Sequence, residues 1–150
     1  MEKNYLSIEL SCRDNPSCIY KKQDLDIEIL IKNTSPTEIG FPLKYITRRG
    51  PAVMLIDVAT QKKMPLRINL APHALLKEFT IIKPGQSVVI NTKLNNSDII
   101  AFREDFVNLI VEISAALKIQ TTENEELVYF NDVAKIKIRG IDTFELELSR

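Results

Sequence analysis

Apolar residues occupy every second position over much of this chain. Between Leu6 and Cys12, and again between Leu25 and Lys32, apolar side chains alternate with mostly polar or charged ones. A period of two puts alternate side chains on opposite faces of an extended chain, so both segments are predicted to be β-strands with one buried face. Further stretches of the same pattern occur at residues 39–45, 53–58, 79–81, 88–90, 107–119, 128–130, 133–138 and 144–148.

Turn-forming residues separate the predicted strands. The run Asn33-Thr34-Ser35-Pro36-Thr37 is predicted to be a turn in which Asn and Ser side chains cap local backbone groups. Arg48-Arg49-Gly50-Pro51 is interpreted as a second turn, and Pro84-Gly85 as the centre of a type II turn where two strands meet. Residues 94–105 could hold one short helical turn, because Ser and Asp residues there can cap it.

Together these patterns predict an all-β fold. Alternating strands with turns spaced between them are typical of an immunoglobulin-like sandwich of two antiparallel sheets, here with about 7–9 strands and little or no helix. A chain of 150 residues suits one domain, covering residues 1–150. The last segment, residues 141–150, is predicted to be an extra edge strand through which the chain could associate with another copy of itself.

Charge and hydropathy argue against several kinds of partner. The 20 basic and 20 acidic residues cancel to a formal net charge of zero, which provides no field to attract nucleic acid or a membrane surface. No apolar run approaches the roughly 20 residues that a membrane-spanning helix needs. The first residues do not resemble a secretory leader. The chain is therefore expected to be cytoplasmic as it stands, or periplasmic or extracellular if a leader has been removed.

Two cysteines, Cys12 and Cys18, flank a run of turn-forming residues. Such a turn could bring the two thiols face to face and allow a disulfide, which would stabilise the fold by about 2–3 kcal/mol in the chain-entropy model. The alternative is that Cys12, in phase with the apolar positions of its strand, is a small buried core residue. The sequence leaves both interpretations open.

Few residues offer catalytic or metal chemistry. His73 is the only histidine; it could pair with a cysteine only if the fold brings them together, and an exposed loop imidazole is the ordinary interpretation. A structural zinc site needs about four sulfur or nitrogen ligands, more than this chain has. The acidic residues 123–126 are interpreted as a solvated hairpin tip rather than a calcium site. We therefore expect no enzymatic activity, no metal and no cofactor.

The order of these signals resembles that of small immunoglobulin-like bacterial domains. The segments that carry the resemblance are residues 25–35, 53–58, 82–87 and 131–138. They are similar to the propeptide domain of deuterolysin-type metallopeptidases and to the intracellular proteinase inhibitor family of bacilli. Such domains act as inhibitors, chaperone-like prodomains or adhesion modules, and the resemblance implies one of these roles.

Recognition surfaces are the remaining candidates for function. Residues 64–74, interrupted by two prolines, are predicted to be an irregular crossover whose apolar side chains either contact a partner or close one end of the core. Basic residues nearby could steer a partner by charge, or belong to an ordinary mixed-charge surface. The candidate contact residues are Met64, Leu66, Ile68, Leu70, His73, Arg48 and Arg49.

We expect the partner to be another protein. The absence of a catalytic constellation, together with a strong fold signal, favours an inhibitor or an immunity-type protein that blocks an enzyme or a toxin. The alternative is a structural, adhesion or secretion-apparatus assembly module.

Overall fold

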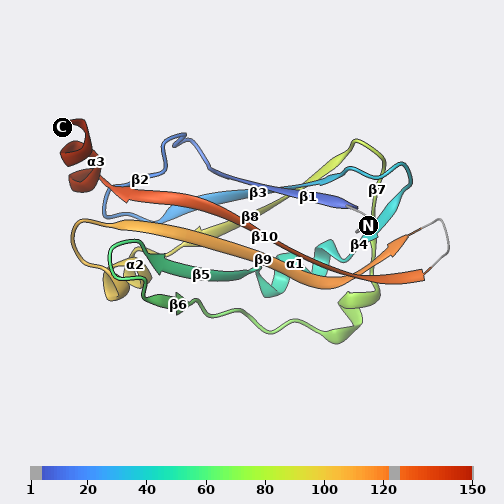
Figure 1. Ribbon diagram of the computed structural model, residues 1–150. Helices are drawn as coiled ribbons and strands as arrows, with labels where there is room; N and C mark the ends of the chain where they lie inside the picture. Colours follow the sequence, from blue (N-terminus) through green and yellow to red (C-terminus); the bar gives the residue numbers. More distant parts are fainter. Residues whose placement is uncertain (1–4, 122–125, 150) are drawn as a thin grey trace.

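The chain forms two β-sheets that face each other (Figure 1). The computed structural model describes residues 5–121 and 126–149, and within them strands predominate, which confirms the mostly-β prediction. The strands are β1 (Leu6–Cys12), β2 (Ile19–Tyr20), β3 (Leu25–Asn33), β4 (Ile39–Phe41), β5 (Ala52–Asp57), β6 (Lys63–Pro65), β7 (Thr80–Ile82), β8 (Ser87–Leu94), β9 (Asn108–Thr121) and β10 (Glu126–Gly140).

More helix is present than the alternating pattern predicts. Three short α-helices and one 3-10 helix occur in the described residues, where little or no helix was expected, and the strands slightly outnumber the predicted set. The helical turn predicted within residues 94–105 is confirmed as α2. The helical elements are α1 (Leu43–Arg49), η1 (His73–Lys77), α2 (Asn96–Phe102) and α3 (Ile141–Leu148).

The smaller sheet has β3 at its centre. This strand pairs antiparallel with β1 on one side and with β8 on the other. In the larger sheet the long strands β9 and β10 pair antiparallel, and the other edge of β9 pairs with β5 and β4. β6 and β7 extend this sheet beyond β5 and β4, and the short β2 runs parallel to the end of β10.

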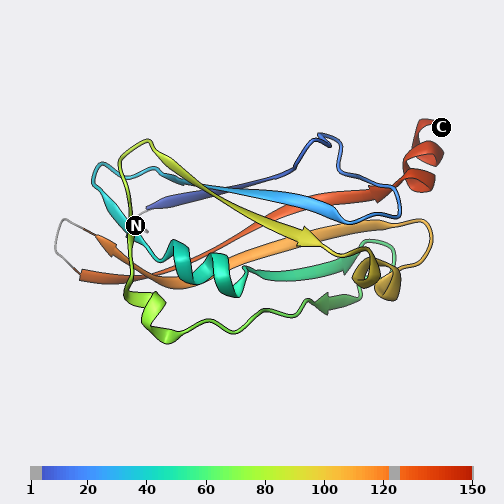
Figure 2. The same cartoon turned by 180° about the vertical axis from the view of Figure 1, so that it is seen from behind.

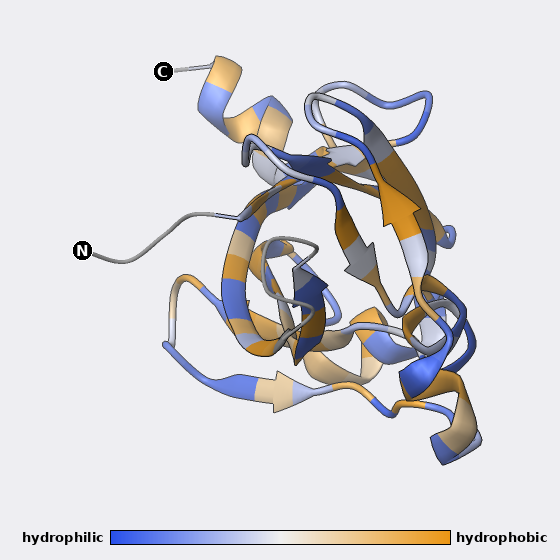
Figure 3. Ribbon diagram, turned by 90° about the vertical axis from the view of Figure 1, so that its right-hand side faces the viewer, coloured by the Kyte–Doolittle hydropathy of each residue, from blue (hydrophilic) through white to orange (hydrophobic). Residues whose placement is uncertain are grey.

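The core lies between the two sheets. Ile27, Ile29 and Ile31 of β3 are each at most 2% exposed, as are Val111 and Ile113 of β9. Seen from the end of the molecule, the strands carry alternating hydrophobic and hydrophilic bands (Figure 3). Burying one such aliphatic side chain contributes about 1.5–3 kcal/mol, so the period-two pattern supplies much of the driving force for this sandwich-like packing.

The Pro-Gly turn forms as predicted but joins different sheets. Gln86 donates its backbone N–H to the carbonyl oxygen of Lys83 at 2.9 Å, and Gly85 has a φ of 78°, as a type II turn requires. The strands on its two sides do not pair with each other, because β7 pairs with β4 and β8 pairs with β3. The turn therefore connects the sheets instead of closing a hairpin.

Cys12 and Cys18 form a disulfide, and both are buried. Their Cα atoms lie 5.4 Å apart, within the usual range for a bridged pair. The two interpretations left open by the sequence are therefore both correct, because Cys12 is bridged and also belongs to the core. The bridge holds the chain entering β2 against the end of β1.

Residues 43–49 form a helix where the alternation predicts a strand and, at Arg48 and Arg49, a turn. β4 stops before Pro42, which has no N–H to donate to a neighbouring strand. Arg48 and Arg49 lie in the last helical turn, where positive charge interacts favourably with the free carbonyl groups. Gly50 ends the helix with a φ of 85°, a conformation that glycine adopts without strain.

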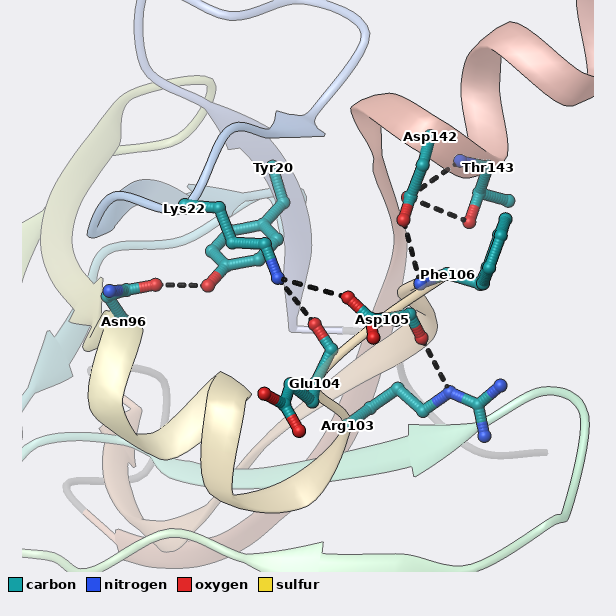
Figure 4. A network of polar contacts seen from close by, with 9 residues as sticks. All are labelled: Tyr20, Lys22, Asn96, Arg103, Glu104, Asp105, Phe106, Asp142 and Thr143. Carbon is teal, nitrogen blue, oxygen red and sulfur yellow. Dashed lines mark hydrogen bonds and ion pairs between the residues drawn. The ribbon is translucent and has the colours of Figure 1, made fainter.

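The C-terminal segment is also helical. The described part of residues 141–150 forms α3, so the predicted edge strand is wrong. The Asp142 carboxylate accepts the backbone N–H of Phe106 at 2.9 Å (Figure 4), and an ion pair joins Arg139 to Glu147. These contacts fix α3 to the start of β9 and the end of β10. Residues 122–125, which include most of the predicted acidic tip, lie outside the described residues.

Candidate functional site

An extended segment leaves the larger sheet after β6 and runs to η1 (Figures 1 and 2). Its backbone is tied to the body of the protein at two places. The N–H of Leu66 donates to the carbonyl oxygen of Val53 at 2.9 Å, and the N–H of Asn69 donates to that of Arg49 at 2.8 Å. We call residues 66–73 the crossover segment.

The structure divides the predicted contact residues into two groups. Met64 and Leu66 are half-buried and pack against the core, so these two help to close it. Ile68 is 50% exposed and Leu70 is 95% exposed. His73 is exposed at the start of η1. The irregular crossover predicted for residues 64–74 is thus confirmed as a loop, apart from the short β6 and η1 at its ends.

A polar groove lies beside the crossover segment. Figure 2 shows α1 between β8 and the chain that follows β6, and residues from these elements and from the start of α2 line one cavity of about 320 Å³. Arg49 and Leu66 are the predicted residues that reach it, whereas Arg48 is exposed elsewhere on α1. We call this cavity the α1–β8 groove. Its lining is Thr47, Arg49, Gly50, Pro51, Val53, Leu66, Arg67, Asn69, Asn91, Thr92, Lys93, Asn95 and Asp98.

Arg49 is held in place from two sides. Its guanidinium carbon lies 5.3 Å from the centre of the Tyr45 ring, and its Nε donates to the carbonyl oxygen of Gly50 at 3.2 Å. Stacking on an aromatic face fixes the plane of the guanidinium. The two terminal nitrogens are left to bind another group.

The charge in the groove is mainly positive. Arg49, Arg67 and Lys93 each contribute one positive charge, and Asp98 contributes one negative charge. Within the described residues, none of these three cations forms an ion pair, whereas Arg103 pairs with a carboxylate of β5 at 3.7 Å. The lining residues therefore carry more positive than negative charge, in a chain of zero net charge.

Contacts from β2 and from the loop that follows it position α2. The backbone N–H of Asn96 donates to the Asp24 carboxylate at 2.7 Å, and the Tyr20 hydroxyl donates to the Asn96 side chain (Figure 4). Burial, and then the negative charge of Asp24, raise the pKa of Tyr20, so the hydroxyl keeps its proton for this bond. The first turn of α2 is thereby fixed, with Asn95 and Asp98 along the groove.

Several residues of the groove could not be identified from the sequence. Lys93 belongs to a strand that pairs with β3, and it lines the same groove as Arg49 only because of the tertiary arrangement of β8 and α1. Arg67 lies in the basic middle of the chain, so its charge was a usable signal.

The sequence also carries a signal for α1 that the predicted strand overlooked: Pro42 precedes the helix, and Arg48-Arg49-Gly50-Pro51 is a typical helix end.

The structure places the candidate catalytic residues as follows. Both cysteines are bridged, so neither offers a thiolate to His73. In the part of the chain that the structure describes, no three His, Cys, Asp or Glu side chains are grouped as metal ligands. None of the described helices is both long enough and apolar enough to cross a bilayer.

Comparison with known proteins identifies no family. No family model matches the sequence, and no curated protein is similar to it. Among solved structures, a structural genomics target has a TM-score of 0.47 at 9% identity, over 95% of this chain and 92% of its own. A Bordetella pertussis protein assigned as ApaA has a TM-score of 0.45 at 9% identity, over 91% and 92% of the two chains.

A β-glucosidase from Listeria innocua is also similar, with a TM-score of 0.41 at 15% identity. The alignment covers 93% of this chain but only 17% of the glucosidase. Similarities of this size carry no argument about function. The function must be argued from the surface of the protein itself.

Proposed function

We propose that this protein is a non-catalytic β-sandwich that binds another protein through the crossover segment and blocks it, as an inhibitor or an immunity-type protein does. The observation that carries the proposal is the exposure of Leu70, which is 95% accessible to solvent, with Ile68 two residues away at 50%. Two such side chains on an irregular segment, beside an unpaired group of cations, have the composition of a protein interface.

Covering Leu70 with a partner yields about 1.5–3 kcal/mol, and covering Ile68, which is only 50% exposed, yields about half as much. The crossover segment is held by the backbone bonds of Leu66 and Asn69, so part of the ordering cost is met before binding. An apolar side chain on a partly fixed backbone can therefore be covered by a partner at a reduced entropic cost.

The inhibitory role has support of a different kind. It comes from the resemblance of residues 25–35 and 131–138 to intracellular proteinase inhibitors, and the immunoglobulin-like class of the sandwich belongs to the same proposal. The partner and its activity are to be identified by affinity capture from the source cells, followed by purification of the captured protein. An inhibitor must then lower the activity of that purified partner.

The decisive experiment compares Leu70→Asp with Leu148→Asp. Both positions are strongly exposed, at 95% and 69%, and they lie on different elements, so the chemical change is matched and only the surface differs. We expect Leu70→Asp to weaken binding of the purified partner at least roughly tenfold, equivalent to about 1.4 kcal/mol, with an unchanged melting temperature. Leu148→Asp should bind normally. Unchanged binding by Leu70→Asp would overturn the proposal.

A second candidate function is an assembly module. The observation that favours it is α3, on which Ile141, Leu146 and Leu148 are 41%, 49% and 69% exposed. Light scattering of wild type against Leu148→Asp tests it. A larger mass for wild type than for the variant would support assembly through α3, and equal monomer masses would reject it.

A further inference from the structure

The α1–β8 groove is lined mainly by polar and charged residues, unlike the exposed apolar part of the crossover segment. We infer that it binds the carboxylates of an acidic segment of the protein partner, an inference that rests on the proposed binding function. Three observations support it: the unpaired cations, the prearranged guanidinium of Arg49, and the continuity of the groove with the exposed apolar residues.

The positive charge of the groove is available to a ligand. Arg49, Arg67 and Lys93 line one concave surface, and Asp98 is the single acidic residue among the lining groups. None of these cations has an ion-pair partner within the described chain. A concave site with like charges attracts counter-charge more strongly than the same charges on a convex surface. The groove is therefore suited to a group carrying about two negative charges.

The geometry of Arg49 favours a carboxylate. One face of the guanidinium stacks on the Tyr45 ring, and its Nε donates to the carbonyl oxygen of Gly50. The terminal nitrogens remain, and a guanidinium of fixed plane presents them as a fork that matches the two oxygens of a carboxylate. Asn69, Asn91 and Asn95 line the same groove, and a side-chain amide is a suitable donor to a carboxylate.

The position of the groove points to a segment of the partner and not to a free small molecule. Asn69 lines the groove and lies between Ile68 and Leu70 in the chain. Both apolar side chains are next to a groove residue in the chain, so a partner that covers them contacts the protein directly beside the groove. Acidic residues on that partner would lie opposite Arg67 and Lys93, where attraction accelerates association and discriminates between partners.

The test uses a matched pair of double variants, Arg67→Glu/Lys93→Glu and Lys62→Glu/Lys63→Glu. Each pair changes the net charge by the same amount, and all four side chains are exposed, but Lys62 and Lys63 lie at the β5–β6 hairpin. The probes are tetraglutamate, tetraglutamine, succinate and inorganic phosphate, titrated into the full chain and followed by backbone amide NMR shifts.

We expect tetraglutamate to bind wild type, with shifts at Asn69 and Lys93, and tetraglutamine not to bind. Binding should weaken roughly tenfold or more in Arg67→Glu/Lys93→Glu, stay within about twofold in the hairpin control, and weaken with added salt. An equal loss in both double variants would overturn the inference, because it would show attraction by net charge alone. Succinate or phosphate binding as tightly as tetraglutamate would also overturn it.

The same variants separate this inference from the proposed function. If Leu70→Asp loses the purified partner while Arg67→Glu/Lys93→Glu keeps it, the groove inference fails and the binding function stands. If Leu70→Asp keeps the partner, the binding function fails as proposed. Loss of the partner in both variants, with normal binding by the hairpin control, would support both.

Discussion

Replacing Asn33 by Ala tests whether one side chain joins the two sheets at the end of β3. Asn33 is fully buried, and its amide makes four hydrogen bonds, which is its full capacity. Oδ1 accepts the backbone N–H of Ser35 at 2.9 Å and the Ser35 hydroxyl at 2.7 Å. Nδ2 donates to the carbonyl oxygens of Thr37 at 2.8 Å and Ile82 at 2.7 Å.

These contacts allow the loss of stability in Asn33→Ala to be calculated. The bond to Ile82 is buried, and a buried carbonyl left without a donor costs about 1–3 kcal/mol. The other three bonds are partly accessible, so water can replace them and each contributes about 0.5–1 kcal/mol. The free energy of unfolding should fall by about 4 kcal/mol, a large part of the roughly 5–15 kcal/mol that stabilises a domain.

Urea unfolding followed by circular dichroism measures this difference, and the free energy comes from the midpoint and slope of each curve. Ser35→Ala is the matched control, because it removes the hydroxyl's bonds to Asn33 and Thr37 but leaves the Ile82 carbonyl paired. These bonds are partly accessible to water, so the variant should lose only about 1–2 kcal/mol. If both variants lose the same amount, or Asn33→Ala loses less than about 1 kcal/mol, the buried bond does not join the sheets as argued.

Two further predictions concern the end of the sandwich that carries β2 and α3. The bridge of Cys12 and Cys18 closes a loop with a sequence separation of 6, so Cys12→Ser/Cys18→Ser should lose about 2 kcal/mol of unfolding free energy in urea. Wild type kept in reductant before and during unfolding should lose the same amount. A double variant as stable as oxidised wild type would contradict this prediction. Burial alone would raise the pKa of Asp142, but backbone N–H groups, first that of Phe106, lower it below its usual value. Its contribution to stability is therefore present above the unfolded-state pKa and is lost as pH falls through the folded-state pKa. The unfolding free energies of wild type and Asp142→Asn should differ at neutral pH and converge in strong acid. A difference that does not change with pH would refute this prediction.

Local sequence patterns were sufficient to predict where a strand lies. The alternation between Leu25 and Lys32 predicts β3 to within one residue, because a buried face needs only the period of the side chains. The pairing of strands is different. Nothing in residues 80–90 shows that the Pro84-Gly85 turn sends β7 and β8 to separate sheets, because a type II turn is compatible with either arrangement.

The two helices that the alternation missed have different explanations. In α1, the apolar residues Leu43, Tyr45 and Ile46 fit both the spacing of two of a strand and the spacing of three of a helix, and the buried Ile46 follows the helical spacing. The residues after Pro42 and before Pro51 carried start and stop signals that outweigh so short an alternation. In α3, the pattern from Phe144 to Leu148 suits a strand equally well, and the decision depends on the contact of Asp142 with Phe106, which is distant in sequence.

The candidate site was therefore half predictable. Its apolar half, Ile68 and Leu70, lies on one irregular segment, and the two prolines that interrupt the alternation there, Pro65 and Pro72, were the signal. Its charged half depends on tertiary structure, because Lys93 and Arg49 line one groove only in the folded arrangement of β8 and α1. Sequence reasoning finds residues that have no place in a core more readily than it finds charges gathered from separate elements.

The half-buried and the exposed residues of the crossover segment differ in what they contact. Leu66 packs against the core, whereas Leu70 contacts mainly solvent, so under the proposed function substitutions at Ile68 and Leu70 should change binding with little effect on folding, and substitutions at Leu66 should change both. Arg67 and Lys93 are likewise exposed. If the partner binds as proposed, its recognition can therefore change through a few side chains that the fold does not need.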